Sequence, residues 1–157
     1  MARQTEEAAA LITANKNASR NYSLFETFKA GMVLQGTEVK AIRAGTVHIH
    51  DAFGSIEREE VFLHAMHIGP YSHGNRENHE PLRKRKLLLH KAEIRKLVGA
   101  IVEKGFTLVP LRLYWEKGRV KIEVALAKGK TKGDRRQDVK QRDAKREMDT
   151  ATKRSKR

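Results

Sequence analysis

The last 30 residues of the 157-residue chain, here called the C-terminal tail (residues 128–157), are too polar to form a hydrophobic core. Their apolar side chains are limited to Val139, Ala144, Met148 and Ala151. A segment with so little apolar surface cannot offset the conformational entropy that it would lose on folding. The compact part of the protein must therefore come from the residues before the tail, which are few enough for a single domain.

The positive charge of the chain is concentrated in this tail. The whole chain has 33 Lys and Arg residues against 19 Asp and Glu residues, a formal net charge of +14 at pH 7. The tail contains 13 basic and five acidic residues, a net charge of +8, and the residues before it carry +6. Such a balance points to a polyanionic partner, most often a nucleic acid.

The tail sequence is compatible with two conformational states. A helix would place the opposite charges of Asp138 and Arg142, and of Asp149 and Lys153, four residues apart. It would also place the like charges of Asp143 and Glu147 four residues apart. Isolated helices of this length are marginal in water. Both a disordered basic extension and a segment that becomes helical against RNA phosphates therefore remain open.

The chain lacks the signals of several other protein classes. It has no cysteine, which excludes disulfides and cysteine-based zinc sites. It has no apolar run of the ~18–20 residues that a membrane-spanning helix needs, and its first residues lack the pattern of a secretory signal. Neither a P-loop nor a G-x-S-x-G motif is present. We therefore expect a cytoplasmic protein that is not an enzyme and uses no cofactor.

Short β-strands are predicted along much of the chain before the tail, because apolar and polar residues alternate there. Residues 22–34 contain one bent strand or two, broken near Ala30 and Gly31, and residues 46–68 contain strands that turn around "EREE". Residues 106–130 form two alternating runs on either side of Gly118, the pattern of a hairpin.

Helical spacing is found in two segments. Residues 36–45 have Thr37 as a candidate N-cap, and residues 90–105 place Glu93 three positions after His90, as in a capping box. Short antiparallel strands with a few helices predict a mainly β fold, an antiparallel barrel of which the OB-fold is the commonest nucleic-acid-binding form.

The expected domain organisation has three parts. Residues 1–14 form a flexible N-terminus, residues 15–127 form the OB-fold-like RNA-binding body, and residues 128–157 form the basic tail.

The sharpest basic cluster is the run from Arg83 to Lys86. Four adjacent cations repel one another unless a polyanion neutralises them. Contact with RNA is favoured over a merely solvated charged stretch, because such runs usually mark nucleic-acid patches.

The seven histidines raise the question of a metal site. Zinc needs three or four converging ligands, and no tight ligand motif is present, so surface histidines are favoured and no metal is expected. A metal-dependent nuclease is kept as a minor alternative, resting on His48, His50, Asp51 and His64.

Aromatic residues are candidates for stacking against bases. The candidates are Tyr22, Phe25, Phe28, Phe53, Tyr71, Tyr114 and Trp115. For any one of them a core position is the favoured interpretation.

Four stretches of the chain, spread in order over about residues 15–148, are distinctive: "QGTEVKAIRAG", "GNRENHEPLRKRKLLLHKAEI", "KGFTLVPLRLYWEKGRVKIEVALAKGK" and "DRRQDVKQRDAKRE". Together they resemble the SmpB family, the SsrA-binding proteins of bacteria. The resemblance implies an OB-fold barrel with helices, and a tail that is disordered in the free protein and helical on the ribosome. It also implies binding to the tRNA-like domain of transfer-messenger RNA (tmRNA, SsrA RNA) and delivery to stalled ribosomes with elongation factor Tu, for trans-translation. The tail would then occupy the decoding centre and the empty mRNA channel of the small subunit.

The resemblance and the basic cluster together predict two sets of contact residues. The tmRNA contacts expected in the body are Asn15, Lys16, Arg20, Tyr22, Glu38, Lys40, Arg83, Arg85, Lys86, Leu88, His90 and Lys91. The ribosome contacts expected in the tail are Lys128, Lys130, Asp134, Arg135, Arg136, Lys140, Arg142, Lys145, Arg146 and Met148.

Some positions depart from the family pattern. Lys29 stands where the family usually has a glutamate, Arg20 where a histidine is usual, and Gly133 where relatives often have His or Tyr. A generic OB-type RNA-binding or ribosome-associated protein would have the same composition, and only the series of motifs separates the two hypotheses.

Overall fold

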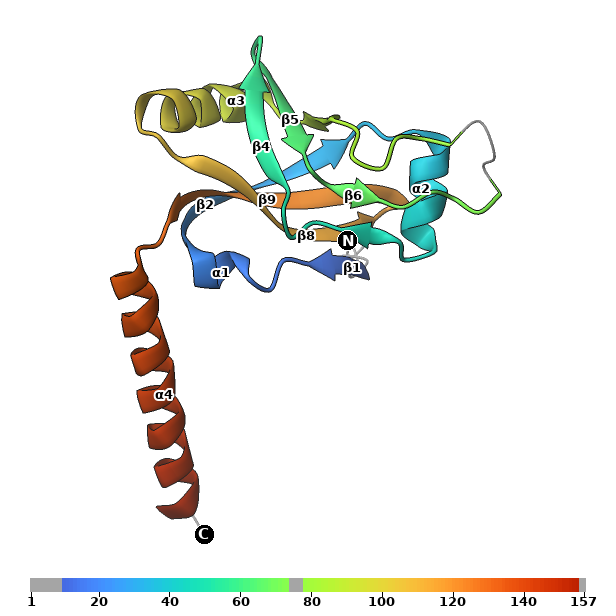
Figure 1. Cartoon of the computed structure of the whole chain (residues 1–157). Helices are drawn as coiled ribbons and strands as arrows, with labels where there is room; N and C mark the ends of the chain where they lie inside the picture. The colour runs from blue at the N-terminus through green and yellow to red at the C-terminus, as the bar shows by residue number, and fades with distance from the viewer. Residues whose placement is uncertain (1–9, 74–77, 156–157) are drawn as a thin grey trace, which may run out of the picture.

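The computed structural model describes residues 10–73 and 78–155, except for the side chain of Arg135. It consists of a β-barrel body from which one long helix projects (Figure 1). Among the described residues, no helix is both long and apolar enough to cross a membrane.

One closed antiparallel sheet forms the body. Its strands are β1 (Ala10–Ala14), β2 (Tyr22–Met32), β4 (Phe53–Glu57), β5 (Glu60–His64), β7 (Arg85–Leu88), β8 (Thr107–Glu116) and β9 (Arg119–Gly129). They follow the order β1-β8-β4-β5-β7-β2-β9, and β9 pairs back with β8, so the sheet closes on itself. A small two-stranded sheet, β3 (Val47–His48) with β6 (His67–Ile68), lies beside the barrel. The predicted mainly β, OB-fold-like barrel is confirmed.

The barrel core is built from the alternation seen in the sequence. On β9, side chains two residues apart point inward and are buried, namely Val120, Ile122, Val124 and Leu126. Val61 and Leu63 on β5 do the same from the opposite side of the barrel. Because successive side chains of a strand point to opposite faces, the residues between them face outward, where Lys121 and Glu123 are half-buried and Ala125 is covered.

Two hairpin turns match their predicted places. Lys117 and Gly118 join β8 to β9 with φ values of 50° and 72°, so both adopt the left-handed conformation of a hairpin turn that follows the strand twist. Arg58 and Glu59 join β4 to β5 in the same way, with φ values of 48° and 62°.

The described helices are α1 (Ala18–Asn21), α2 (Gly36–Arg43), α3 (Lys91–Val98), which continues into the π-helix η2 (Gly99–Glu103), and α4 (Lys132–Ser155). The predicted capping box of α3 is confirmed, since the His90 backbone N–H donates to Glu93 Oε1 at 3.2 Å. The predicted cap of α2 is wrong by two residues. Gln35, not Thr37, is the N-cap, and its backbone N–H donates to Glu38 Oε1 at 2.8 Å.

The boundaries of the body are wider than predicted. Residues 10–14 form β1, whose pairing with β8 sets Ala10 opposite Trp115 and Ala14 opposite Arg112. The flexible N-terminus expected over residues 1–14 is therefore wrong for these five residues, because their backbone fills the edge of β8; residues 1–9 lie outside the description. At the other end β9 runs to Gly129, which pairs with Tyr22, so Lys128 belongs to the barrel.

Candidate nucleic-acid interface

The predicted N-terminal contact stretch connects β1 to β2 through α1. Asn15 is buried here: its backbone N–H donates to Leu111 O at 2.7 Å and its Nδ2 to Pro110 O at 3.2 Å. Its side chain anchors the segment to β8 and does not reach the surface, contrary to the prediction of an RNA contact. Lys16, before α1, and Arg20, within α1, are exposed, and Tyr22 is half-buried.

This stretch touches the first turns of α4. Lys130 holds the two together, because its Nζ donates to Ser19 O at 2.8 Å and forms an ion pair with Asp138, while its backbone N–H donates to Asn21 O at 2.9 Å. A cavity of about 650 Å³ lies between α1 and α4, lined by Asn17, Arg20, Asn21, Arg136, Asp138, Val139, Lys140 and Arg142. Four predicted RNA-contact residues, one from the body and three from the tail, therefore share one basic groove.

A second group of predicted residues surrounds a larger groove, here called the β7–α3 groove. It has a volume of about 850 Å³ and includes Lys86, Leu88, His90 and Lys91 among its lining residues. Leu88 is 51% exposed there and gives this basic groove an apolar side chain. Leu88 pairs with Gly31 of β2, where an added Cβ would lie 3.4 Å from the Leu88 Cβ.

The β7–α3 groove also contains cations that the sequence analysis missed as contacts. Lys121 from β9, Arg95 from α3 and Lys29 from β2 line it. These three residues are far apart in the chain, and only the closing of the barrel brings them together. Lys29, which departs from the family pattern, therefore lies beside residues that agree with it.

Each cation of the basic run from Arg83 to Lys86 is paired with a carboxylate of the protein itself. Lys84 Nζ lies 2.6 Å from Glu57 Oε2, and Lys86 Nζ lies 3.0 Å from Glu60 Oε1. Arg83 and Arg85 both pair with Glu38. The expectation that these cations repel until RNA arrives is wrong, because carboxylates 26 to 47 residues away in sequence fold back onto them.

Two of the predicted RNA contacts, Glu38 and Arg85, form a buried structural pair. Both side chains are fully inaccessible to solvent. Arg85 Nη1 also donates to Met66 O at 2.6 Å and Nη2 to Pro81 O at 3.2 Å, and Arg83 Nη2 donates to Glu38 Oε1 at 2.5 Å. The pair ties α2 to β7 and to the segments around it. Neither side chain can touch RNA in this fold.

The electrostatics of this pair favour its ionised form. Burial by itself would raise the pKa of Glu38, but hydrogen bonds from Arg83, from the Gln35 backbone and from Arg85 hold that pKa below its ordinary value. Burial lowers the pKa of Arg85, and the Glu38 carboxylate partly offsets that effect. The carboxylate is thus charged near neutral pH and is compensated by two guanidinium groups.

Lys40 lies on the exposed side of α2, away from the residues that line the two grooves. Its Nζ is 5.4 Å from the centroid of the Tyr71 ring. This contact fixes the lysine against the segment after β6, and a phosphate could still approach its exposed face.

Most of the predicted ribosome contacts lie along α4. Lys128 and Lys130 are the exceptions, because both come before the helix begins at Lys132. Lys128 lies on β9, 4.6 Å from the centroid of the Phe106 ring. Asp134 caps α4, because its carboxylate accepts from the Thr131 backbone N–H and its own N–H donates to Thr131 Oγ1, both at 3.2 Å. Arg135 is in the helix, but its side chain lies outside the description. The remaining predicted residues are exposed along the helix: Arg136, Lys140, Arg142, Lys145, Arg146 and Met148.

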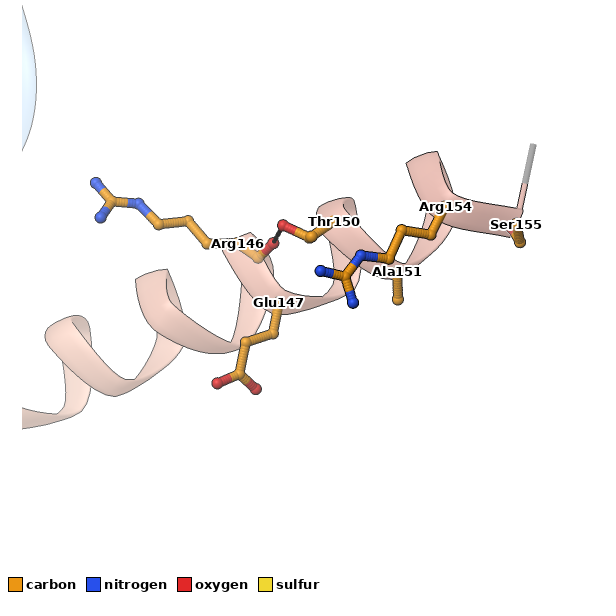
Figure 2. Close-up of a pocket in the computed structure, with 6 residues that line it drawn as sticks. All are labelled: Arg146, Glu147, Thr150, Ala151, Arg154 and Ser155. Atoms are coloured by element: carbon orange, nitrogen blue, oxygen red, sulfur yellow. Dashed lines mark hydrogen bonds between the residues drawn. The ribbon is translucent and has the colours of Figure 1, made fainter. Parts of the chain in front are cut away.

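The far end of α4 presents charged side chains to solvent. Figure 2 shows Arg146 and Glu147 extending outward from the helix and Arg154 running back along it toward Ala151. Thr150 Oγ1 donates to Arg146 O at 2.8 Å. Met148 is 72% exposed on this part of the helix. A helix with so little buried surface gains little stability from packing against the rest of the chain.

The histidines do not form a metal centre in the described part of the chain, where no three His, Cys, Asp or Glu side chains gather closely enough to hold an ion. His48 instead lies against other rings, with centroids 6.4 Å from His50 and 5.9 Å from His67. Among the candidate stacking aromatics, Phe28 and Tyr114 are buried as favoured, whereas Phe25 and Phe53 are 52% and 46% exposed.

Comparisons with known proteins agree with this architecture. The family model described as "SmpB protein" matches residues 12–154. The SsrA-binding proteins of Bacillus pumilus (strain SAFR-032) and Geobacillus kaustophilus (strain HTA426) are each 55% identical to the chain over 141 residues. These alignments cover 90% of this chain and 90% and 91% of the two relatives. The SsrA-binding protein of Bacillus subtilis (strain 168) is 54% identical, with 90% of each chain covered.

A solved structure from the study "tmRNA-SmpB: a journey to the center of the bacterial ribosome" matches with a TM-score of 0.64 and 42% identity, over 81% of this chain and 93% of that chain. The family model covers nearly all of the described barrel and α4, and the relatives match over nine-tenths of the sequence. The chain belongs to the SmpB family of SsrA-binding proteins.

Proposed function

We propose that this protein binds the tRNA-like domain of tmRNA and delivers it to stalled ribosomes for trans-translation. The observation that carries the proposal is the family match over residues 12–154, which includes both the barrel and the tail helix. The relatives are named SsrA-binding proteins, and the structural match comes from a tmRNA–SmpB study of the ribosome. A net charge of +14 gives the chain the electrostatic character that an RNA partner needs.

The body supplies the tmRNA-binding surface in this proposal. The β7–α3 groove combines exposed cations with the exposed apolar side chain of Leu88, so it offers both phosphate contacts and an apolar contact for a sugar or base. Arg20 on α1 offers a further phosphate contact that does not depend on the tail. Glu38 and Arg85 contribute indirectly, because they hold the strand that carries Lys86 and Leu88.

The tail serves the ribosome. We propose that it is disordered in the free protein and forms α4 when it enters the decoding centre and the empty mRNA channel of the small subunit. Its exposed cations point outward along the whole helix, which suits a channel walled by RNA phosphates. Elongation factor Tu accompanies the complex during delivery, and the protein acts in the cytoplasm as a binding adaptor without catalytic activity.

The test compares the full-length chain with a chain that ends at Lys130, which keeps β9 and removes α4. Both are titrated at physiological salt against the tRNA-like domain of tmRNA and against an ordinary elongator tRNA. Both are then supplied to stalled ribosomes in a peptide-tagging assay. We expect both chains to bind the tRNA-like domain tightly and selectively, and only the full-length chain to support tagging.

The alternative is a generic OB-type RNA-binding or ribosome-associated protein. It predicts equally tight binding to any tRNA, lost together with the basic tail, because the attraction would then be purely electrostatic. Such a result would overturn the adaptor function.

A further inference from the structure

The β4–β5 hairpin carries a pair of stacked rings on its outer face. Phe53 and His64 lie directly opposite each other in the register of the two strands. Their ring centroids are 5.2 Å apart and their planes differ by only 13°. Phe53 is nevertheless 46% exposed, so part of its ring that the imidazole does not cover is open to solvent.

The rings are held in place from both sides of the sheet. Ser55 Oγ and His64 Nε2 share a hydrogen bond of 2.6 Å, which fixes the imidazole. On the inner side, Gly54 packs directly on β8, where a Cβ would come within 2.4 Å of the Leu108 Cδ2 atom. Because the strand cannot move inward and the imidazole is tethered, the open face of Phe53 is fixed before any ligand arrives.

This surface continues into the β7–α3 groove. Phe62 pairs with Ser55 on one side and with Lys86 on the other, so the side chains of these three residues share the outer face. Lys84 Nζ lies 4.5 Å from the centroid of the Phe62 ring. The Phe53 strand is thus two strand spacings, or about 10 Å, from the strand that carries Lys86.

We propose that the open face of Phe53 binds an unpaired RNA base, which stacks on the Phe53–His64 pair. RNA-binding proteins commonly recognise unstacked bases on aromatic side chains, and the planar rings here match a planar ligand. An apolar protein side chain would instead favour a concave site, and neither Phe53 nor His64 is among the residues that line the two grooves described above. Lys84 and Lys86 are paired with Glu57 and Glu60, so the net positive charge of the whole chain is what favours an anionic polymer over a neutral partner.

The inference rests on the proposed function and adds to it a contact on β4 and β5, which carry none of the predicted tmRNA contact residues. An unpaired base of this kind can belong to the tRNA-like domain itself or to ribosomal RNA. Two binding measurements distinguish these sources: binding to the isolated tRNA-like domain of tmRNA, and binding of the tmRNA complex to stalled ribosomes.

The experiment uses three full-length variants. Phe53→Leu removes the ring but keeps an apolar side chain, and Phe53→Trp keeps a ring. Phe25→Leu is the matched control, because Phe25 is 52% exposed but meets Phe106 edge-on, with 4.9 Å between centroids and 82° between planes. Urea unfolding of each variant checks that all three keep the fold.

We expect Phe53→Leu to weaken binding about 5- to 100-fold in one of the two measurements, the range expected for the loss of one stacked base. Phe53→Trp and Phe25→Leu should bind like the unchanged protein. The inference is overturned if Phe53→Leu binds normally in both measurements, or if Phe25→Leu weakens binding as much as Phe53→Leu. If the unchanged protein itself fails to bind the tRNA-like domain selectively, the proposed function fails instead, which separates the two conclusions.

Discussion

Replacing Glu38 by glutamine should destabilise the protein far more than replacing either of the other carboxylates, Glu57 or Glu60, that pair with the basic run from Arg83 to Lys86. Glu38 and Arg85 are both fully buried, and Arg83 donates to the same carboxylate. The amide keeps the shape of the side chain but leaves the Arg85 guanidinium charged, buried and without a counter-ion. Breaking a buried pair by removing one partner costs about 3–5 kcal/mol. For a domain of this size that corresponds to a fall in Tm of roughly 6–20 °C.

The assay is urea and thermal unfolding of Glu38→Gln beside the control Glu60→Gln. Glu60 pairs with Lys86 at 3.0 Å, but the two side chains are 46% and 41% exposed, and pairs of this kind contribute little. We expect the control to unfold almost like the unchanged protein. If both variants lose the same small amount, the buried pair does not hold α2 to β7 and the reasoning is refuted.

The pH dependence of stability gives an independent measure of the same pair. The folded pKa of Glu38 lies below its ordinary value of 4.5, so the unfolded chain binds this proton more readily than the folded protein does. The stabilisation from Glu38 is therefore complete above about pH 4.5 and is lost as the pH falls through the folded pKa. The stability of Glu38→Gln should fall less steeply than that of the unchanged protein between pH 6 and pH 3. Equal slopes would show that the carboxylate gains nothing from its two arginines.

Three further predictions concern the tail, the groove and the barrel. A peptide of residues 131–155 should show little helix by circular dichroism in dilute buffer, because α4 is almost entirely exposed, and should gain helix clearly in trifluoroethanol. A strongly helical peptide in plain buffer would contradict the proposed disorder of the free tail. Lys91→Gln in the β7–α3 groove should weaken binding to the tRNA-like domain and reduce the slope of log K against log salt by about 1. Lys104→Gln, an exposed lysine that does not line the grooves, is its control and should leave the slope unchanged. Gly54→Ala should cost about 1–3 kcal/mol in urea unfolding, because the added methyl would meet the Leu108 side chain within 3 Å, and a neutral result would mean that β4 can move away from β8.

Much of the fold follows from local sequence patterns. The period-2 alternation of residues 119–126 predicted β9 and its buried face, and Gly118 marked the turn before it. The pairing of His90 with Glu93 marked the start of α3. These features depend on residues within a few positions of one another, which is why the sequence reveals them. The short run at residues 10–14 did not reveal β1, because an edge strand is defined by the partner that it pairs with.

The candidate site was predicted less completely than the fold. The sequence placed Lys86, Leu88, His90 and Lys91 together, and the structure puts them in one groove. It could not assign Lys121, Arg95 and Lys29 to the same groove, because three separate elements contribute them. Nor could it separate the exposed Phe53 from the buried Phe28, since both lie in similar alternating segments.

Composition alone separates the chain into two parts. The residues before the tail include enough apolar side chains to form a core, whereas the tail, with a net charge of +8, has too few to fold by itself. Composition decides this, because burial of apolar surface must exceed the entropy lost on folding. Only the tertiary structure decided which charges are free to bind RNA. Glu38, Glu57 and Glu60 reach the basic run of β7 only when the barrel closes, and they leave Arg85 buried and its neighbours paired. Charge is a property of each residue, but its availability depends on partners that strand register brings from distant parts of the chain.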